Sequence, residues 1–296
     1  MTTLRHHIID KENSLTVRDI LTQHFHISFS LRKQLTRRTG AIRLNGRGVT
    51  VSYSVHSGDL LEVDITDPAP QNPVHPVDYP LDILWEDEYL LALNKPAGIV
   101  VHGAELTEET VTIAGAVAHY LGNQSFHGVN RLDRGTTGVM LVAKSGYLHA
   151  RCMELLQSGG LSREYRAVCE GILSPASGTI DLPIGRDESS LLRRCVREDG
   201  AKAITEYEVL ETASKRSLLR LLPRTGRTHQ LRVHMAAIGH PLVGDWLYGT
   251  EDHSLITRPA LHSYILRFIH PVTEEKIFVT APLPEDLRRL MNSPAE

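Results

Sequence analysis

The chain has 296 residues, of which 41% are hydrophobic and 23% are charged, and its formal net charge is −3. These values are typical of a soluble globular protein of one or two domains and exclude collagen, wholesale disorder and a disulfide scaffold. No apolar run approaches the roughly 20 residues that span a bilayer. The N-terminus lacks a secretory signal, so we expect a cytoplasmic protein. Taken alone, the net charge argues weakly against a nucleic-acid partner.

The charge is unevenly distributed. Residues 18–47 contain seven basic residues and one acid, and residues 215–234 contain six basic residues and no acid. Two such segments can bind an anion locally even when the whole chain is nearly neutral. The alternative is two solvated charged faces, and charge alone does not decide between these interpretations.

A proline-rich segment divides the chain. Four prolines within residues 67–76 predict a semi-rigid, extended linker, because proline fixes φ and removes a hydrogen-bond donor. We therefore expect an N-terminal tail (1–12), a small module (13–66), a linker (67–78) and a larger domain (79–296). The three cysteines are far apart in the sequence, which indicates neither a disulfide framework nor a zinc knuckle.

In the small module, apolar residues at helical spacing predict a helix over 17–25. A second helix is expected over 30–38, with Ser30 as its N-cap and basic side chains around its surface. A strand over 41–44 should end at Asn45-Gly46, since both residues tolerate the positive φ of a tight turn. An alternating strand follows over 60–65.

In the larger domain, strands and helices interleave. Strands are predicted over 81–85, 90–94, 138–143, 164–170, 203–210, 217–222, 260–268 and 276–280. Helices are predicted over 111–121, 147–157, 229–238 and 284–291. Several strands are separated only by turns, which favours antiparallel pairing. We expect an α+β fold with a mixed, mainly antiparallel sheet flanked by helices, preceded by a small α/β module.

Three motifs could carry chemistry, and the first surrounds Asp133. This carboxylate lies between Arg131 and Arg134, and nearby cations favour its charged form. An ionised carboxylate before a strand could be a nucleophile, a general base or a metal ligand. It could also form an ion pair that pins the loop, and spacing alone favours that structural role.

The second motif places Tyr165 on an alternating strand. Its side chain could stack on a base or move a proton, although spacing alone favours a half-buried core tyrosine. In the third motif, Arg227 and Arg232 bracket the start of a helix, and guanidinium groups suit a phosphate or a carboxylate. His229 and His234 are five residues apart and do not share a helix face, so no metal site is predicted. Glycine-rich phosphate loops are also absent, so no cofactor is predicted.

These motifs resemble those of a known family. The segments NRLDRGTTGVMLVAKS (130–145), REYRA (163–167), GRTHQLRVHMAAIGHPLVGDWLYG (226–249) and LHSYILRFIHP (261–271) look like the successive motifs of the RluA-like pseudouridine synthases. The resemblance covers residues 79–290. Asn130 stands where the family usually has histidine. The small module is similar to the S-four RNA-binding fold, through its basic helix and the pattern LNG…V…GD (44–59).

The resemblance implies an enzyme that isomerises uridine to pseudouridine in RNA without a cofactor or metal. Asp133 would be the catalytic carboxylate, and Arg232 would pair with it. Tyr165 would contact the uracil and take part in proton transfer, and Arg131 would help to displace the target base. Whether Asp133 attacks the ribose or uracil carbon-6 stays open.

We expect further basic residues to contact RNA. Around the catalytic motifs and in the small module these are Arg131, Arg134, Arg227, His229, Arg32, Lys33, Arg37, Arg38 and Arg43. The substrate is expected to be structured ribosomal RNA, with transfer RNA as the alternative, and the protein a monomer. Two other functions compete with the synthase: a non-catalytic RNA-binding factor, and a hydrolase that uses Asp133 on a small substrate.

Overall fold

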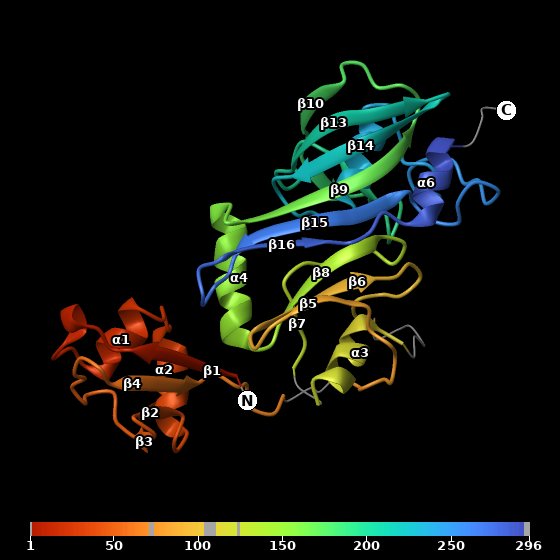
Figure 1. The fold of residues 1–296 in the computed structure, drawn as a ribbon. Helices are drawn as coiled ribbons and strands as arrows, with labels where there is room; N and C mark the ends of the chain where they lie inside the picture. Colours follow the sequence, from red (N-terminus) through yellow and green to blue (C-terminus); the bar gives the residue numbers. More distant parts are fainter. Residues whose placement is uncertain (1, 71–73, 104–110, 123–124, 293–296) are drawn as a thin grey trace.

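The computed structural model describes residues 2–70, 74–103, 111–122 and 125–292. A four-stranded sheet has the order β1-β4-β2-β3, and a ten-stranded sheet is built on the order β10-β13-β14-β9-β15-β8-β6-β5. In the larger sheet β16 also pairs with β15 and β7 with β8, while β11 and β12 form a separate ladder. The small sheet and its helices lie at one end of α4 (Gly146–Ser158), shown in red and orange in Figure 1.

The small module contains four strands, two helices and a 3-10 turn. Its elements are β1 (Thr3–His7), η1 (Asp10–Glu12), α1 (Val17–Gln23), α2 (Phe29–Arg37), β2 (Ile42–Leu44), β3 (Arg47–Gly48) and β4 (Leu60–Asp64). The predicted Asn45-Gly46 turn joins β2 to β3, with φ of 51° and 76° at its two residues. Ser28, rather than the expected Ser30, caps α2 by accepting from the Leu31 amide.

The first residues are not a tail. Strand β1 pairs antiparallel with β4 over its whole length and forms an edge of the small sheet. The sequence analysis missed β1 because its histidines and arginine obscure the alternation of buried and exposed positions. This difference extends the ordered part of the module to the beginning of the described chain.

The larger part has the predicted α+β architecture. Its remaining strands are β5 (Ile83–Glu86), β6 (Leu90–Lys95), β7 (His127–Gly128), β8 (Thr137–Ala143), β9 (Leu161–Glu170), β10 (Ser177–Asp181), β11 (Ile184–Arg186), β12 (Arg194–Val196), β13 (Ile204–Ala213), β14 (Arg216–Pro223), β15 (Leu261–Ile269) and β16 (Lys276–Thr280). Its helices besides α4 are α3 (Ile113–Tyr120), α5 (Gln230–Ala237) and α6 (Glu285–Asn292). Pairing is mainly antiparallel, whereas β8 and β15 run parallel.

Both faces of the large sheet are covered by helices. Side chains alternate along each strand, so one strand contributes residues to the core on each face. On β8, Val139 and Leu141 pack in a core that includes α4, while Met140 and Val142 pack in one that includes α3 and α5. All seven residues of β8 are therefore buried. This rigid central strand follows directly after the Asp133 loop.

Gly138 allows β8 to approach β15 closely. Its φ is +105°, and a Cβ built there would lie 2.1 Å from the Ser263 carbonyl oxygen. Any side chain would force the two strands apart or strain the backbone. Because Asp133 is only five residues earlier, this contact helps to fix where its loop leaves the sheet.

The two parts of the chain are joined by specific contacts. The Tyr147 hydroxyl of α4 donates to the Phe25 carbonyl at 2.6 Å, and the Tyr89 hydroxyl donates to the Thr3 carbonyl at 3.2 Å. Asp67, at the start of the proline-rich segment, accepts from the Gly146 amide at 3.0 Å. The beginning of that segment is therefore anchored. In the part of the chain that the structure describes, every helix is too short or too polar to cross a membrane.

Candidate active site

The three residues predicted to be catalytic, Asp133, Tyr165 and Arg232, line one cavity of about 740 Å³. Asp133 comes from the loop before β8, Tyr165 from β9 and Arg232 from the first turns of α5. Their positions in the sequence span a hundred residues, yet the sheet order brings β8 and β9 to either side of β15. The structure therefore assembles a carboxylate, a phenol and a guanidinium at one surface.

Arg232 lies between two carboxylates. Its Nε and Nη2 donate to Asp245 at 2.7 Å each, and its Nη1 reaches Asp133 Oδ2 at 3.4 Å. Asp245 is completely buried, Arg232 is 5% exposed, and the Asp133 side chain is 32% exposed. Burial acts to lower the pKa of Arg232, but the Asp245 bonds and charge outweigh it, so the pKa is raised. The charged guanidinium thus holds the more accessible carboxylate at the cavity wall.

Tyr165 is buried beside this pair. It is 6% exposed, and its strand β9 is paired with β14 at Leu221 and with β15 at Ser263. Burial raises the pKa of its phenol, with the Asp133 charge acting in the same direction. The side chain therefore offers a neutral aromatic face and a protonated hydroxyl at neutral pH.

Gln230 fixes the turn that precedes α5. Its side-chain oxygen accepts from the Thr225 hydroxyl at 2.7 Å and the Arg227 amide at 3.0 Å. Its amide nitrogen donates to the Ile204 carbonyl at 2.9 Å. This satisfied buried amide ties the turn to β13, and His229 caps α5 in a left-handed conformation with φ of 57°.

His229 lines the cavity beside Asp133 and is held by Tyr248. His229 Nε2 is 3.9 Å from Asp133 Oδ2, and its Nδ1 is 2.8 Å from the Tyr248 hydroxyl. The Tyr248 ring also lies 5.0 Å from the Arg232 guanidinium carbon. Burial lowers the pKa of His229, which favours a neutral imidazole. Sequence reasoning singled out neither Tyr248 nor Asp245, although both lie within a quoted motif.

Sequence reasoning also missed Lys95. It is 1% exposed, and its Nζ donates to the Pro96 carbonyl at 2.8 Å and the Arg134 carbonyl at 3.3 Å. Burial lowers its pKa to about 8, although the Asp133 charge acts in the opposite direction. Lys95 therefore ties strand β6 to the backbone of the Asp133 loop.

Asn130, which stands where histidine was expected, is hydrogen-bonded to the backbone of β8. The residue is 5% exposed; its side-chain oxygen accepts from the Leu141 amide at 2.8 Å, and its nitrogen donates to the Val139 carbonyl at 3.3 Å. It thereby satisfies two backbone groups of β8. Its role is to hold the segment before Asp133 against the sheet.

The expected RNA-binding residues divide into two places. Arg131 and Arg227 are exposed and line the cavity, and Arg227 Nε also donates to the Lys202 carbonyl. Arg134 is exposed and donates to the Gly98 carbonyl at 3.0 Å. His229 lines the cavity as well. The small module supplies the remaining residues, outside the cavity lining: Arg32, Lys33, Arg37, Arg38 and Arg43. Among them, Lys33 and Arg37 are exposed on α2.

Several basic residues have acidic partners that local sequence did not reveal. Arg224 forms two 2.8 Å bonds to Glu206, and Arg220 contacts both Glu208 and the buried Glu164. In the small module, Arg38 and Arg43 likewise pair with Asp64 and Glu62 on β4. Strand pairing therefore places acids opposite Arg220 and Arg224, so part of the positive charge of residues 215–234 is compensated within the protein.

The structure also explains His234 and reveals an unexpected cluster. Both ring nitrogens of His234 are hydrogen-bonded, to the Thr205 hydroxyl and the Leu182 carbonyl at 2.9 Å each, which suits a core histidine.

Within the described ranges, the group with metal-ligand geometry is His6, Glu12 and His24, in the small module rather than in the cavity.

Comparison with known proteins decides the family. The model of the RNA pseudouridylate synthase family matches residues 89–237, which include Asp133, Tyr165 and Arg232. An uncharacterized RNA pseudouridine synthase of Bacillus subtilis, YjbO, is 39% identical over 264 residues, covering 85% of this chain and 90% of the relative. The chain belongs to the RNA pseudouridine synthase family. As in the family, the synthase isomerises uridine to pseudouridine in RNA, with base flipping and an aspartate in catalysis.

Other relatives agree. The ribosomal large subunit pseudouridine synthase D of Zymomonas mobilis is 35% identical to the synthase, with 83% of each chain covered. The solved structure of human RNA pseudouridylate synthase domain containing 1 superposes with a TM-score of 0.58 at 27% identity. That match covers 69% of the synthase and 83% of the human chain.

Proposed function

We propose that Asp133 is the nucleophile of this synthase and that Arg232 positions it. The observation that carries the proposal is the shared guanidinium, which is anchored by two bonds to the fully buried Asp245 and directs its remaining arm to Asp133. A buried ion pair contributes uncertainly to stability, because desolvation opposes attraction. Its value here is a fixed orientation of the attacking carboxylate.

Tyr165 contacts the uracil ring and takes part in proton transfer. Its burial beside Asp133 and its raised pKa support a phenol that keeps its proton until the reaction needs it. The reaction breaks the bond between ribose and uracil nitrogen-1, turns the ring, and joins ribose to carbon-5. Nitrogen-1 must gain a proton after its bond to ribose breaks, and carbon-5 must lose its proton after it joins ribose. We assign both transfers to Tyr165, whose phenol gives its proton to nitrogen-1 and then takes the carbon-5 proton in return.

A uridine reaches this cavity only when it leaves its stack, at a cost of a few kcal/mol. Arg131 is exposed at the cavity and is charged, so it can occupy the position that the extruded base leaves. Arg227 and His229 line the same cavity, and Arg134 follows Asp133 in its loop; we assign all three to the RNA backbone beside the target. Phosphate contacts of this kind orient the RNA without specifying its sequence.

The small module is proposed to bind the RNA outside the cavity. We retain the division into module (13–66), linker (67–78) and catalytic domain (79–296), and we add β1 to the module. On α2, the Phe29 side chain is 73% exposed and the Arg32 guanidinium carbon lies 5.5 Å from its ring centre. Lys33 and Arg37 are exposed on the same helix. An aromatic ring among cations suits unpaired bases and phosphates.

Ribosomal RNA is the proposed substrate. The support is the set of relatives named ribosomal large subunit pseudouridine synthase D, which are 35–36% identical over 83–88% of this chain. Modification of that RNA would place the monomeric enzyme in the cytoplasm. Pseudouridine mapping of ribosomal and transfer RNA, with and without the protein, tests the proposal. A site lost only from ribosomal RNA is expected, and a site lost only from transfer RNA would overturn the substrate.

A further inference from the structure

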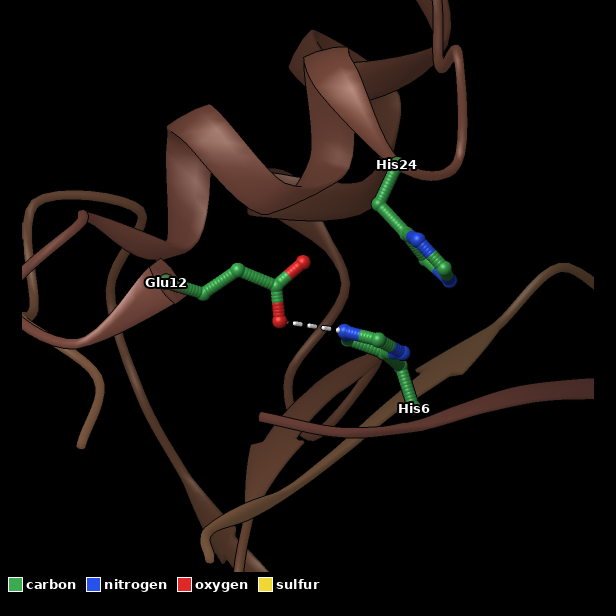
Figure 2. Close-up of side chains that lie close together, drawn as sticks. All are labelled: His6, Glu12 and His24. Carbon is green, nitrogen blue, oxygen red and sulfur yellow. Dashed lines mark hydrogen bonds and ion pairs between the residues drawn. The ribbon is translucent and has the colours of Figure 1, made fainter. Parts of the chain in front are cut away.

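Three potential metal ligands meet in the small module, and none of them lines the cavity. His6 lies on β1, Glu12 ends η1, and His24 caps the C-terminal end of α1. Their ligand atoms all lie within 4.8 Å of one another. Figure 2 shows the carboxylate of Glu12 and the two imidazole rings gathered in the space between the strand and the helix. No part of the isomerisation uses these residues.

The geometry points to a zinc site formed by His6, Glu12 and His24. Two imidazoles and one carboxylate are a donor set that Zn²⁺ binds, with a water as fourth ligand. Imidazole donors disfavour Mg²⁺ and Ca²⁺, which prefer oxygen. The site would be structural, because it links β1, η1 and α1 within the first 24 residues.

The present distances require only local adjustment. His6 Nε2 is 2.7 Å from Glu12 Oε2, and Glu12 Oε2 also accepts from the Ile9 amide at 3.1 Å. Bonds of roughly 2.1 Å in a tetrahedron separate ligand atoms by roughly 3.4 Å, so the first pair must open and His24 must approach. His24 is exposed and at a helix end, so its ring can move without disturbing the core.

The local charges support zinc binding. Burial acts to raise the pKa of Glu12, but hydrogen bonds from His6 and Ile9 outweigh it, and the pKa is lowered. Burial lowers the pKa of His24, with His6 acting in the same direction. Metal binding requires an ionised carboxylate and neutral imidazoles, so zinc affinity should fall as the pH is lowered.

The position of the cluster connects it to the rest of the enzyme. The ring of Phe25 contacts both imidazoles, at centroid distances of 6.1 Å from His6 and 4.9 Å from His24. The carbonyl of the same residue accepts the hydroxyl of Tyr147 on α4. Zinc would therefore stiffen the surface through which the module contacts the larger domain.

The alternative is a metal-free contact. The two rings stack with centroids 3.6 Å apart, and the hydrogen bond between His6 and Glu12 already joins strand to turn. Those contacts persist without any ion and predict no dependence on zinc. Direct measurement of zinc binding separates the two interpretations.

The test uses the full chain, treated with a chelator and then dialysed against zinc at increasing concentrations. We expect one tightly bound zinc per chain, and His24→Gln should weaken that binding at least ~10-fold, because loss of even an outer partner of a ligand costs ~10–100-fold. The matched control is His7→Gln, which changes the neighbouring exposed histidine of β1 and should leave binding intact. Equal zinc binding by His24→Gln and the wild type, or no tight site in the wild type, would overturn the proposal.

Two further measurements keep the test independent of folding defects. His24→Cys retains a zinc ligand at the same position and should restore the tight site. Zinc should raise the thermal midpoint of the wild type and His7→Gln, but not that of His24→Gln, because a ligand that binds only the folded state stabilises it. Mg²⁺ should have no such effect, and an equal rise with Mg²⁺ would contradict the assignment.

Discussion

Arg232 and Asp245 form a two-bond ion pair inside the protein, with Nε–Oδ2 and Nη2–Oδ1 distances of 2.7 Å. Asp245 also accepts from the backbone amides of Leu247 and Tyr248 at 3.1 and 3.3 Å. The carboxylate is thus fully engaged, and it holds the guanidinium in one orientation. The remaining arm of Arg232 points to Asp133, so in the proposed mechanism Asp245 would act on the reaction through Arg232 without touching the substrate.

Asp245→Asn should therefore reduce kcat at least ~10-fold while leaving the KM for RNA nearly unchanged. It should also lower the free energy of unfolding by about 3 kcal/mol, because it leaves a buried guanidinium poorly compensated. Single-turnover kinetics and denaturant unfolding measure the two effects. Asp64→Asn, which breaks the Arg38 pair of the small module, is the control and should keep kcat. A rise in KM alone would contradict a positioning role.

Local patterns were sufficient for much of the fold. Every strand and helix expected in the larger domain is present with ends shifted by a few residues, because side-chain periodicity is a local property. Strand β1 was missed because buried Leu4 and half-buried His6 do not form an apolar alternation. The short β11 and β12 gave no periodic signal either.

The candidate site was also predicted only in part. Asp133, Tyr165 and Arg232 were identified through motif resemblance, and the structure brings all three to one cavity. Lys95 and Asp245 could not be found from composition, because their importance comes from burial and from partners far along the chain. Counting charges along a segment also treated every arginine as available to bind an anion. The structure shows that some are already paired with an acid on a neighbouring strand, as Arg224 is with Glu206.

His262 should make the enzyme sensitive to acid. It is 1% exposed, its Nδ1 lies 2.8 Å from the Thr137 hydroxyl, and burial lowers its pKa to about 4. Between that value and the unfolded value near 6.5 the unfolded chain binds more protons, so stability falls as pH drops through this window. The contribution is up to about 3 kcal/mol. Unfolding at pH 6.5 and pH 4 should show a smaller difference in His262→Gln than in the wild type; an equal difference would assign the loss to other groups.

The double variant Lys33→Gln/Arg37→Gln should weaken RNA binding and flatten its dependence on salt. Each lost phosphate contact lowers the logarithmic salt slope by about one. Both side chains are exposed on α2, so folding should be unaffected. Arg288→Gln on α6 removes a comparable exposed charge outside the module. Binding titrations at several salt concentrations provide the measurement, and an unchanged slope in the double variant would count against the module as an RNA-binding surface.

Removing zinc with a chelator should lower the thermal stability of the enzyme but leave its isomerisation activity intact. The proposed zinc site lies in the small module, whereas Asp133, Tyr165 and Arg232 need no metal for the steps assigned to them. Activity should persist in EDTA below the unfolding temperature, while the thermal midpoint falls. Loss of isomerisation at a temperature where the chelated enzyme is folded, with recovery on adding zinc or magnesium, would overturn the metal-free chemistry.

The most direct measurement is pseudouridine formation by Asp133→Asn in an RNA that the wild type modifies. The substitution removes the nucleophile but retains the size of the side chain, so folding and RNA affinity should match those of the wild type. The account predicts no detectable pseudouridine in single-turnover reactions with the variant in excess. A folded Asp133→Asn enzyme that still isomerises uridine would contradict the assignment of Asp133 as the catalytic nucleophile.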